Sequence, residues 1–211
     1  MFLCWSAKGG SGTTVIAAAL ALVLSQRNPT TVVDLAGDLP AALGIAVPAG
    51  PGVREWMASP TADAAALARL GVPVSDRLQL LPLGSSSAAA TRWADLAAAL
   101  PRDTTVIDAG TGIPPPELIA AADHTLLVTR PCYLALRRAA ASGVQSSGIV
   151  LVGEPGRALT ARDIEHALGA PVVAELHYDP AVARAVDAGL LAARLPATLS
   201  HALTRALKKA A

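Results

Sequence analysis

Short apolar runs rich in β-branched residues alternate along this chain with longer segments rich in alanine and leucine. Apolar runs of this length are typical of buried strands, and the longer segments have the composition of helices. Parallel strands need crossover helices and are therefore buried on both faces, so the alternation predicts a mostly parallel sheet flanked by helices. We expect strands over residues 2–7, 30–35, 77–83, 104–108, 125–130, 147–152 and 171–176.

The intervening segments predict the helices that cover this sheet. We expect them over residues 13–26, 62–70, 88–100, 115–122, 132–142, 160–168, 181–193 and 197–209. The Pro- and Gly-rich segment 48–60 indicates a loop around a short helix that carries Trp56. No internal repeat or long linker interrupts the pattern, so we expect a single doubly wound α/β domain over residues 1–211.

Composition excludes several classes of protein. Hydrophobic residues make up 53% and charged residues 16% of the chain, which excludes a disordered protein. The formal net charge of +1 provides no broad basic field for DNA. The longest apolar run, residues 15–24, is too short to span a bilayer, and the glycines before it disfavour a signal peptide. Cys4 and Cys132 have no metal-ligand spacing, so we expect buried free thiols in a reducing cytoplasm.

The stretch SAKGGSGTT, residues 6–14, lies between the first predicted strand and the first predicted helix. Glycines at such a turn let backbone N–H groups converge on a phosphate, and the helix N-terminus adds a favourable dipole. Phosphate loops normally end in Gly-Lys-Ser/Thr, but Thr13 stands here where the lysine belongs. The phosphate-binding candidates are Lys8, Gly9, Gly10, Ser11, Gly12, Thr13 and Thr14. The alternative is a plain strand-to-helix turn without a ligand.

Two aspartates end predicted strands and are candidates for a Mg²⁺ site with the Thr14 hydroxyl. Asp34 follows TTVV and Asp108 follows TTVI. Ligands bind at the carboxyl ends of parallel strands, and a carboxylate there usually positions Mg²⁺ or its waters. Asp108 is the stronger candidate of the two, and the alternative role for each is to cap the following turn.

These motifs resemble the MinD/ParA group of P-loop ATPases over almost the whole chain. AKGGSGTT is similar to the group's deviant phosphate loop, KGGxGK[ST], and Lys8 matches its signature lysine. The segment VVDLAGDLPAALG resembles switch I, and VIDAGTG resembles the Walker B and switch II segment, Asp108 through Gly112. Within the group, the GD after the second strand and GEPGRALTARDIEHALG are closest to CpaE/TadZ-like proteins of pilus assembly and to septum-site relatives.

The chain departs from this pattern at three elements of one site. Thr13 replaces the loop lysine, and Ala36 stands where switch I usually has its second aspartate unless Asp38 substitutes. Gly153 stands near the position where relatives often have an asparagine that reads adenine. A lysine about 4 Å from a phosphate charge gains roughly 4 kcal/mol at an effective dielectric of about 20. Its loss would weaken binding by up to about a thousandfold. We therefore expect ATP or ADP with Mg²⁺ to bind weakly, and hydrolysis to suffer more than binding.

The resemblance implies a cytoplasmic homodimer that acts as a positioning or scaffold factor. Its partner would belong to a pilus, secretion or division assembly, with recruitment to a pole, the septum or the inner membrane face. The alternative is an active ATPase that cycles between monomer and dimer, as in DNA partitioning, with Lys8, Asp38 and Asp108 as catalytic candidates. Helix 197–209 is expected to pack on the domain, and a membrane-surface role for it is the weaker alternative.

Overall fold

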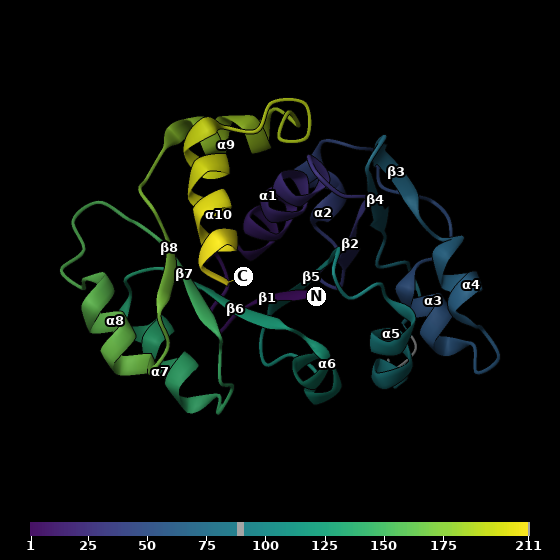
Figure 1. Ribbon diagram of the computed structural model, residues 1–211, viewed down its shortest axis with the longest axis horizontal. Helices are drawn as coiled ribbons and strands as arrows, with labels where there is room; N and C mark the ends of the chain where they lie inside the picture. Colours follow the sequence, from purple (N-terminus) through teal and green to yellow (C-terminus); the bar gives the residue numbers. More distant parts are fainter. Residues whose placement is uncertain (88–90, 211) are drawn as a thin grey trace.

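The computed structural model describes residues 1–87 and 91–210, with the side chains of 208–210 excepted. Its strands are β1 (Phe2–Ser6), β2 (Thr30–Asp34), β3 (Val72–Ser75), β4 (Leu78–Leu81), β5 (Thr105–Thr111), β6 (His124–Thr129), β7 (Gly148–Val152) and β8 (Val172–Leu176). They form an eight-stranded sheet in the order β3-β4-β2-β5-β1-β6-β7-β8 (Figure 1). All neighbouring strands are parallel except β3 and β4. The predicted mostly parallel α/β architecture is confirmed.

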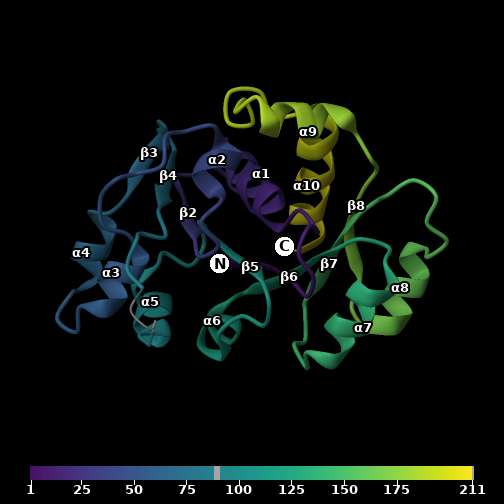
Figure 2. The same cartoon turned by 180° about the vertical axis from the view of Figure 1, so that it is seen from behind.

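Helices cover both faces of this sheet. They are α1 (Thr13–Ser25), α2 (Leu39–Leu43), α3 (Val53–Ala58), α4 (Ala64–Ala68), α5 (Trp93–Ala99), α6 (Pro116–Ala121), α7 (Tyr133–Ala141), α8 (Ala161–Leu168), α9 (Pro180–Asp187) and α10 (Ala197–Ala210). Figure 1 shows α1, α2, α9 and α10 above the sheet and α5 to α8 below it, and Figure 2 shows the same layers from behind. Among the described helices, none has both the length and the hydropathy needed to cross a membrane.

Strand β1 lies in the middle of the sheet and is buried along its whole length. Successive side chains alternate between the faces, so Phe2 and Cys4 pack in the α1 layer while Leu3 and Trp5 pack on the opposite side. Helix α1 is itself buried on nearly all sides, and alanines supply much of its contact surface. The continuous apolar sequence of these elements follows from burial on both faces.

Four elements differ locally from the predicted ones. Strand β3 was not predicted because Pro73 lacks an N–H donor, and it lies at the sheet edge, antiparallel to β4, where that loss is tolerated. The short helix α2 was also missed. Residues 88–90 of the predicted helix 88–100 lie outside the described part of the chain. Within the described part, the corresponding helix α5 begins at Trp93. Helix α9 ends at Asp187, before Gly189 with φ 64°.

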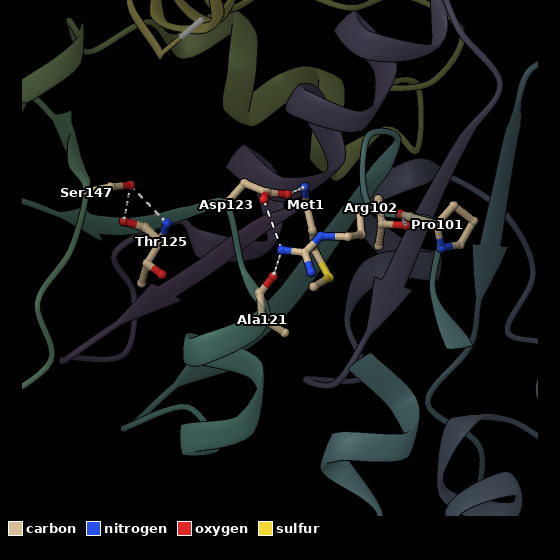
Figure 3. A network of polar contacts seen from close by, with 8 residues as sticks. Met1, Pro101, Arg102, Ala121, Asp123, Thr125 and Ser147 are labelled. Atoms are coloured by element: carbon tan, nitrogen blue, oxygen red, sulfur yellow. Dashed lines mark hydrogen bonds and ion pairs between the residues drawn. The ribbon is translucent and has the colours of Figure 1, made fainter. Parts of the chain in front are cut away.

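A polar network closes the amino-terminal edge of the sheet (Figure 3). The Met1 amino group donates to the Asp123 carboxylate, and Arg102 donates to its other oxygen at 3.1 Å. These contacts lower the pKa of Asp123 to about 2. The Thr125 N–H donates to the Ser147 hydroxyl at 3.0 Å, which links β6 to the residue that precedes β7. The opposite, carboxyl-terminal edge carries the glycine loop and is the edge available to a ligand.

Candidate functional site

The glycine loop joins the carboxyl end of β1 to the first turn of α1. Gly10 and Gly12 have φ of 77° and 92°, and a Cβ at either position would meet no heavy atom within 4 Å. Their conformation therefore favours glycine, and the space above them is open. The Ser11 hydroxyl donates to the Lys8 carbonyl at 2.7 Å and holds the loop closed. Gly12 is the N-cap of α1 and offers no side chain, so the first N–H groups of α1 are left for a ligand.

An open cleft of about 520 Å³ lies between this loop and the carboxyl ends of β2 and β5. Its walls include most of the predicted phosphate-binding residues, but neither Lys8 nor Gly9. The lining residues are Gly10, Ser11, Gly12, Thr13, Thr14, Val15, Leu35, Ala36, Asp38, Ala109, Gly110 and Thr111. The structure thus brings the predicted loop and the two predicted strand ends around one cleft.

Asp108 lies under the cleft on β5 and is fully buried. Its Oδ1 accepts a hydrogen bond from the Gly110 N–H at 3.0 Å, whereas its Oδ2 has no partner within the described structure. Burial raises the pKa of Asp108 to about 6. The Thr14 hydroxyl and the Gly110 N–H act in the opposite direction, because they stabilise the charged carboxylate. Asp34 and Asp38 raise the pKa further. A buried carboxylate oxygen without a partner is costly unless a donor or a cation completes it.

Asp34 lies at the end of β2 and is also buried, but its carboxylate is fully engaged. Its Oδ1 accepts from the N–H groups of Ala36 and Gly37 at 3.0 and 2.6 Å, and its Oδ2 accepts from Leu39 at 3.2 Å. Burial still raises its pKa, with these three bonds acting in the opposite direction. The geometry is that of a side chain that shapes the turn into α2.

The two switch I positions differ in what they present to the cleft. Ala36 offers only its methyl group, and a Cβ at Gly110 would lie 2.9 Å from it, so the chain is tightly packed at this point. Asp38 is exposed, lines the cleft and makes no capping hydrogen bond to α2. Its carboxylate is therefore available to a ligand or a water molecule in the cleft.

Lys8 extends away from the cleft toward the loops that follow β6 and β7. Its ammonium group contacts the Gly9 carbonyl at 3.5 Å. It also acts electrostatically on Cys132 and Glu154 in those two loops.

The Cys132 thiol is only partly buried, and the predicted burial holds fully for Cys4 alone. Neighbouring backbone N–H groups of Ala135 and Leu134 lower the pKa of Cys132 despite partial burial.

A second, larger cavity of about 930 Å³ adjoins the cleft, since Gly12 and Val15 line both. Its other walls come from the loops after β7 and β8, from α9 and from α10, and most of its surface is apolar. Gly153 lies in this wall and donates to the Leu176 carbonyl at 2.6 Å. A Cβ at Gly153 would lie 2.9 Å from that oxygen, so a larger residue would require β7 and β8 to separate locally.

Arg130 also lines this cavity and was not predicted as a site residue. It is exposed and directly follows β6, which pairs with β1 beside the glycine loop. No motif marks it in the sequence. The signal that could have identified it is its position at the carboxyl end of a central parallel strand.

The fold is similar to those of three solved ATPase-related structures. A ParA family ATPase from Chlorobium tepidum has 24% identity and a TM-score of 0.79, over 98% of this chain and 96% of that chain. The septum site-determining protein MinD from Pyrococcus horikoshii, complexed with Mg-ADP, has 17% identity and a TM-score of 0.78, over 99% and 94%. An ATP complex of Cyanothece McdA has 17% identity and a TM-score of 0.77, over 98% and 96%.

No protein-family model matches the chain, and no curated protein matches its sequence. At the identities above, the structural similarity establishes the fold alone, a mostly parallel α/β fold shared with these ParA and MinD structures.

Proposed function

We propose that this chain is a nucleotide-binding positioning or scaffold factor of the MinD/ParA type with weak or no ATP hydrolysis. The observation that carries the proposal is the buried Asp108 carboxylate, whose Oδ2 lacks a partner beneath the glycine loop. A cation held at this oxygen would offset the cost of burying it. The uncapped N-terminus of α1 beside it provides a site for phosphate.

The residues around the cleft fit a nucleotide phosphate group with Mg²⁺. Gly10, Gly12 and the first N–H groups of α1 would bind phosphate, while Thr14 and Asp108 would hold the metal with its waters. Within the described residues, no group of three or more His, Cys, Asp or Glu side chains could hold a metal by itself. This agrees with Mg²⁺ arriving with ATP or ADP, because Mg²⁺ usually binds through one or two carboxylates and substrate phosphates. Bound there, Mg²⁺ would neutralise phosphate charge.

Two substitutions support weak hydrolysis. Thr13 places a neutral side chain at the start of α1, so the cleft receives no ammonium group from the loop itself. Ala36 cannot orient a water molecule by hydrogen bonding. Both losses fall on groups that act where charge develops in the transition state, so turnover should decline more than affinity. Asp34 is fully used by the turn into α2, so we assign it the role of shaping switch I.

An active ATPase is the second candidate, and Asp38 is the observation in its favour. Its exposed carboxylate lines the cleft without a capping bond, and it acts electrostatically on Asp108. In this reading Asp38 orients the attacking water in place of Ala36. A partitioning ATPase that binds DNA nonspecifically is disfavoured by the net charge of +1.

The partner would be a second copy of the chain, facing the site edge, together with a protein of a pilus, secretion or division assembly. Exposed Ile113, Tyr133 and Tyr178 follow β5, β6 and β8 and so fringe this edge with apolar surface. The CpaE/TadZ-like motifs favour pilus assembly, and the similarity to a septum site-determining protein favours septal placement. We propose a cytoplasmic location with recruitment to a pole, the septum or the inner membrane face.

Calorimetric titration with ATP and ADP, with and without Mg²⁺, tests this proposal together with a phosphate-release assay. We expect weak binding that depends on Mg²⁺, lost in Asp108→Ala, and negligible turnover. Thr13→Lys should tighten ATP binding by about tenfold to a thousandfold. Turnover that is abolished by Asp38→Ala or Asp108→Ala would support the ATPase instead. If no nucleotide binds to either the unmodified chain or Thr13→Lys, the proposed function is wrong.

A further inference from the structure

Asp34 and Asp108 lie on one side of the glycine loop, and Arg130 and Arg157 lie on the other. The sheet order places β5 and β2 on one side of β1, and these strands carry Asp108 and Asp34. It places β6 and β7 on the other side, and the loops that follow them carry Arg130 and Arg157. The two aspartates and these two arginines thus lie on opposite sides of the loop, and the larger cavity on the arginine side is also lined by Glu154, Glu175, Asp179 and Asp187.

The loops that directly follow β6 and β7 carry one carboxylate, Glu154, and Arg157 pairs with it. Arg157 donates to Glu154 at 2.9 Å, and this contact holds the pKa of Glu154 below its usual range. Arg130 and Lys8 act on the same carboxylate more weakly. Within the described residues, no hydrogen bond or ion pair engages the Arg130 guanidinium. Arg130 is therefore an available cation, while Arg157 is already committed.

Arg130 shares a cavity with two residues of the glycine loop and α1 that a bound nucleotide would pass. It lines the larger cavity together with Gly12 and Val15, which also line the cleft under the loop. A nucleoside phosphate with its base in the larger cavity and its phosphates in the cleft would pass these two residues. A guanidinium presents a planar fork of N–H donors that matches phosphate oxygens in pairs.

We propose that Arg130 binds a phosphate group of the nucleotide and supplies, from the end of β6, the cation that Thr13 does not supply from the loop. This inference rests on the proposed nucleotide binding. The ligand class is a nucleoside phosphate, and the contribution of Arg130 should grow with the number of phosphate charges. The geometry assigns Lys8 no such role, because Lys8 lines neither cavity.

The test is calorimetric titration of the whole chain with adenosine, AMP, ADP and ATP, comparing Arg130→Gln with Arg138→Gln. Arg138 is a matched control because it is an exposed arginine on α7, eight residues further along, and lines neither cavity. We expect Arg130→Gln to weaken ADP and ATP binding about tenfold to a hundredfold while adenosine binding is unchanged. Arg138→Gln should behave as the unmodified chain, and unchanged melting temperatures would show that both variants fold.

A double variant separates loss of charge from local distortion. Adding Thr13→Lys to Arg130→Gln should recover most of the lost ATP affinity, because it returns a cation to the same phosphates. Equal ATP affinity in Arg130→Gln and the unmodified chain would overturn the role of Arg130 while leaving the proposed function intact. An equal loss for adenosine and ATP would also overturn it, since the contact would then not be to phosphate. Absence of nucleotide binding by both the unmodified chain and Thr13→Lys would overturn both proposals.

Discussion

Asp34 and Asp108 are register partners on the adjacent parallel strands β2 and β5, yet their carboxylates differ in hydrogen bonding. The Asp34 carboxylate accepts three backbone hydrogen bonds, whereas Asp108 Oδ2 accepts none within the described structure. One buried carboxylate is thus part of the fold, and its neighbour is left incomplete for a ligand. The two residues should respond differently to substitution.

Replacement of Asp108 by Asn should stabilise the ligand-free protein at neutral pH. The pKa of Asp108 is raised to about 6, so the folded state retains a proton that the unfolded state releases near pH 4. The contribution of Asp108 to stability is therefore most favourable below about pH 4 and declines as pH rises through 6. Asp108→Asn removes this decline, worth up to about 3 kcal/mol for a shift of about two units.

Urea denaturation at pH 4 and pH 8 measures this effect. The gain should be present at pH 8 and small at pH 4. Asp38→Asn is the control, because Asp38 is an exposed carboxylate on the same cleft. A loss of stability in Asp108→Asn at pH 8 would contradict the prediction.

Replacement of Asp34 by Ala should have the opposite sign. It removes the acceptor for three backbone N–H groups, one of which belongs to the buried residue Leu39. Leaving such donors unpaired costs about 1–3 kcal/mol each when they are buried, and less where water reaches them. We expect a loss of about 2–4 kcal/mol in the free energy of unfolding, measured in the same urea series. A neutral result would show that the turn into α2 does not depend on Asp34.

Gly44 and Gly189 form a close backbone contact between the ends of α2 and α9. A Cβ at Gly44 would lie 1.8 Å from the Gly189 carbonyl oxygen. Gly169 is a matched control, because it also ends a helix with positive φ, 65° against 75°, but has no atom near its Cβ position. Gly169→Ala should cost about 1 kcal/mol for the backbone conformation. Gly44→Ala should cost at least about 2 kcal/mol more in thermal or urea unfolding, and equal costs would refute the contact.

Glu55 on α3 holds the segment that follows β4. Its carboxylate accepts from the N–H groups of Gly52 and Ser85, each at 2.8 Å, and from Ser86. Partial burial raises the pKa of Glu55, but these bonds outweigh it and lower the pKa to about 2. The resulting stabilisation is present above about pH 4.5 and is lost as pH falls toward 2.

Glu55→Gln should therefore lower the free energy of unfolding by about 1–2 kcal/mol at pH 7, after allowance for solvent screening. The difference from the unmodified chain should shrink toward zero near pH 2. A difference that is independent of pH would indicate that shape and not charge decides the role of Glu55.

The sequence by itself determined seven strands of the sheet and the position of the glycine loop. Strands that are buried on both faces must be apolar throughout. The central strands could therefore be predicted from continuous β-branched runs such as 30–35 and 104–108. Gly10 and Gly12 marked the loop between the first strand and the first helix, because only glycine readily adopts the positive φ that this turn requires. The positions of Thr13 and Thr14 then follow from the loop motif.

Only the tertiary structure decided how the two aspartates differ and where the available cation lies. Asp34 and Asp108 each follow a similar apolar run, and the sequence favoured Asp108 as the metal candidate without showing the reason. The turn into α2 brings three N–H groups to the Asp34 carboxylate, whereas Asp108 Oδ2 has no partner within the described structure. Arg130 and Gly12 are far apart in sequence and line one cavity only because β6 pairs with β1. Hydrogen-bond satisfaction depends on the exact path of a turn, and charge proximity depends on distances across strands; a linear pattern contains neither.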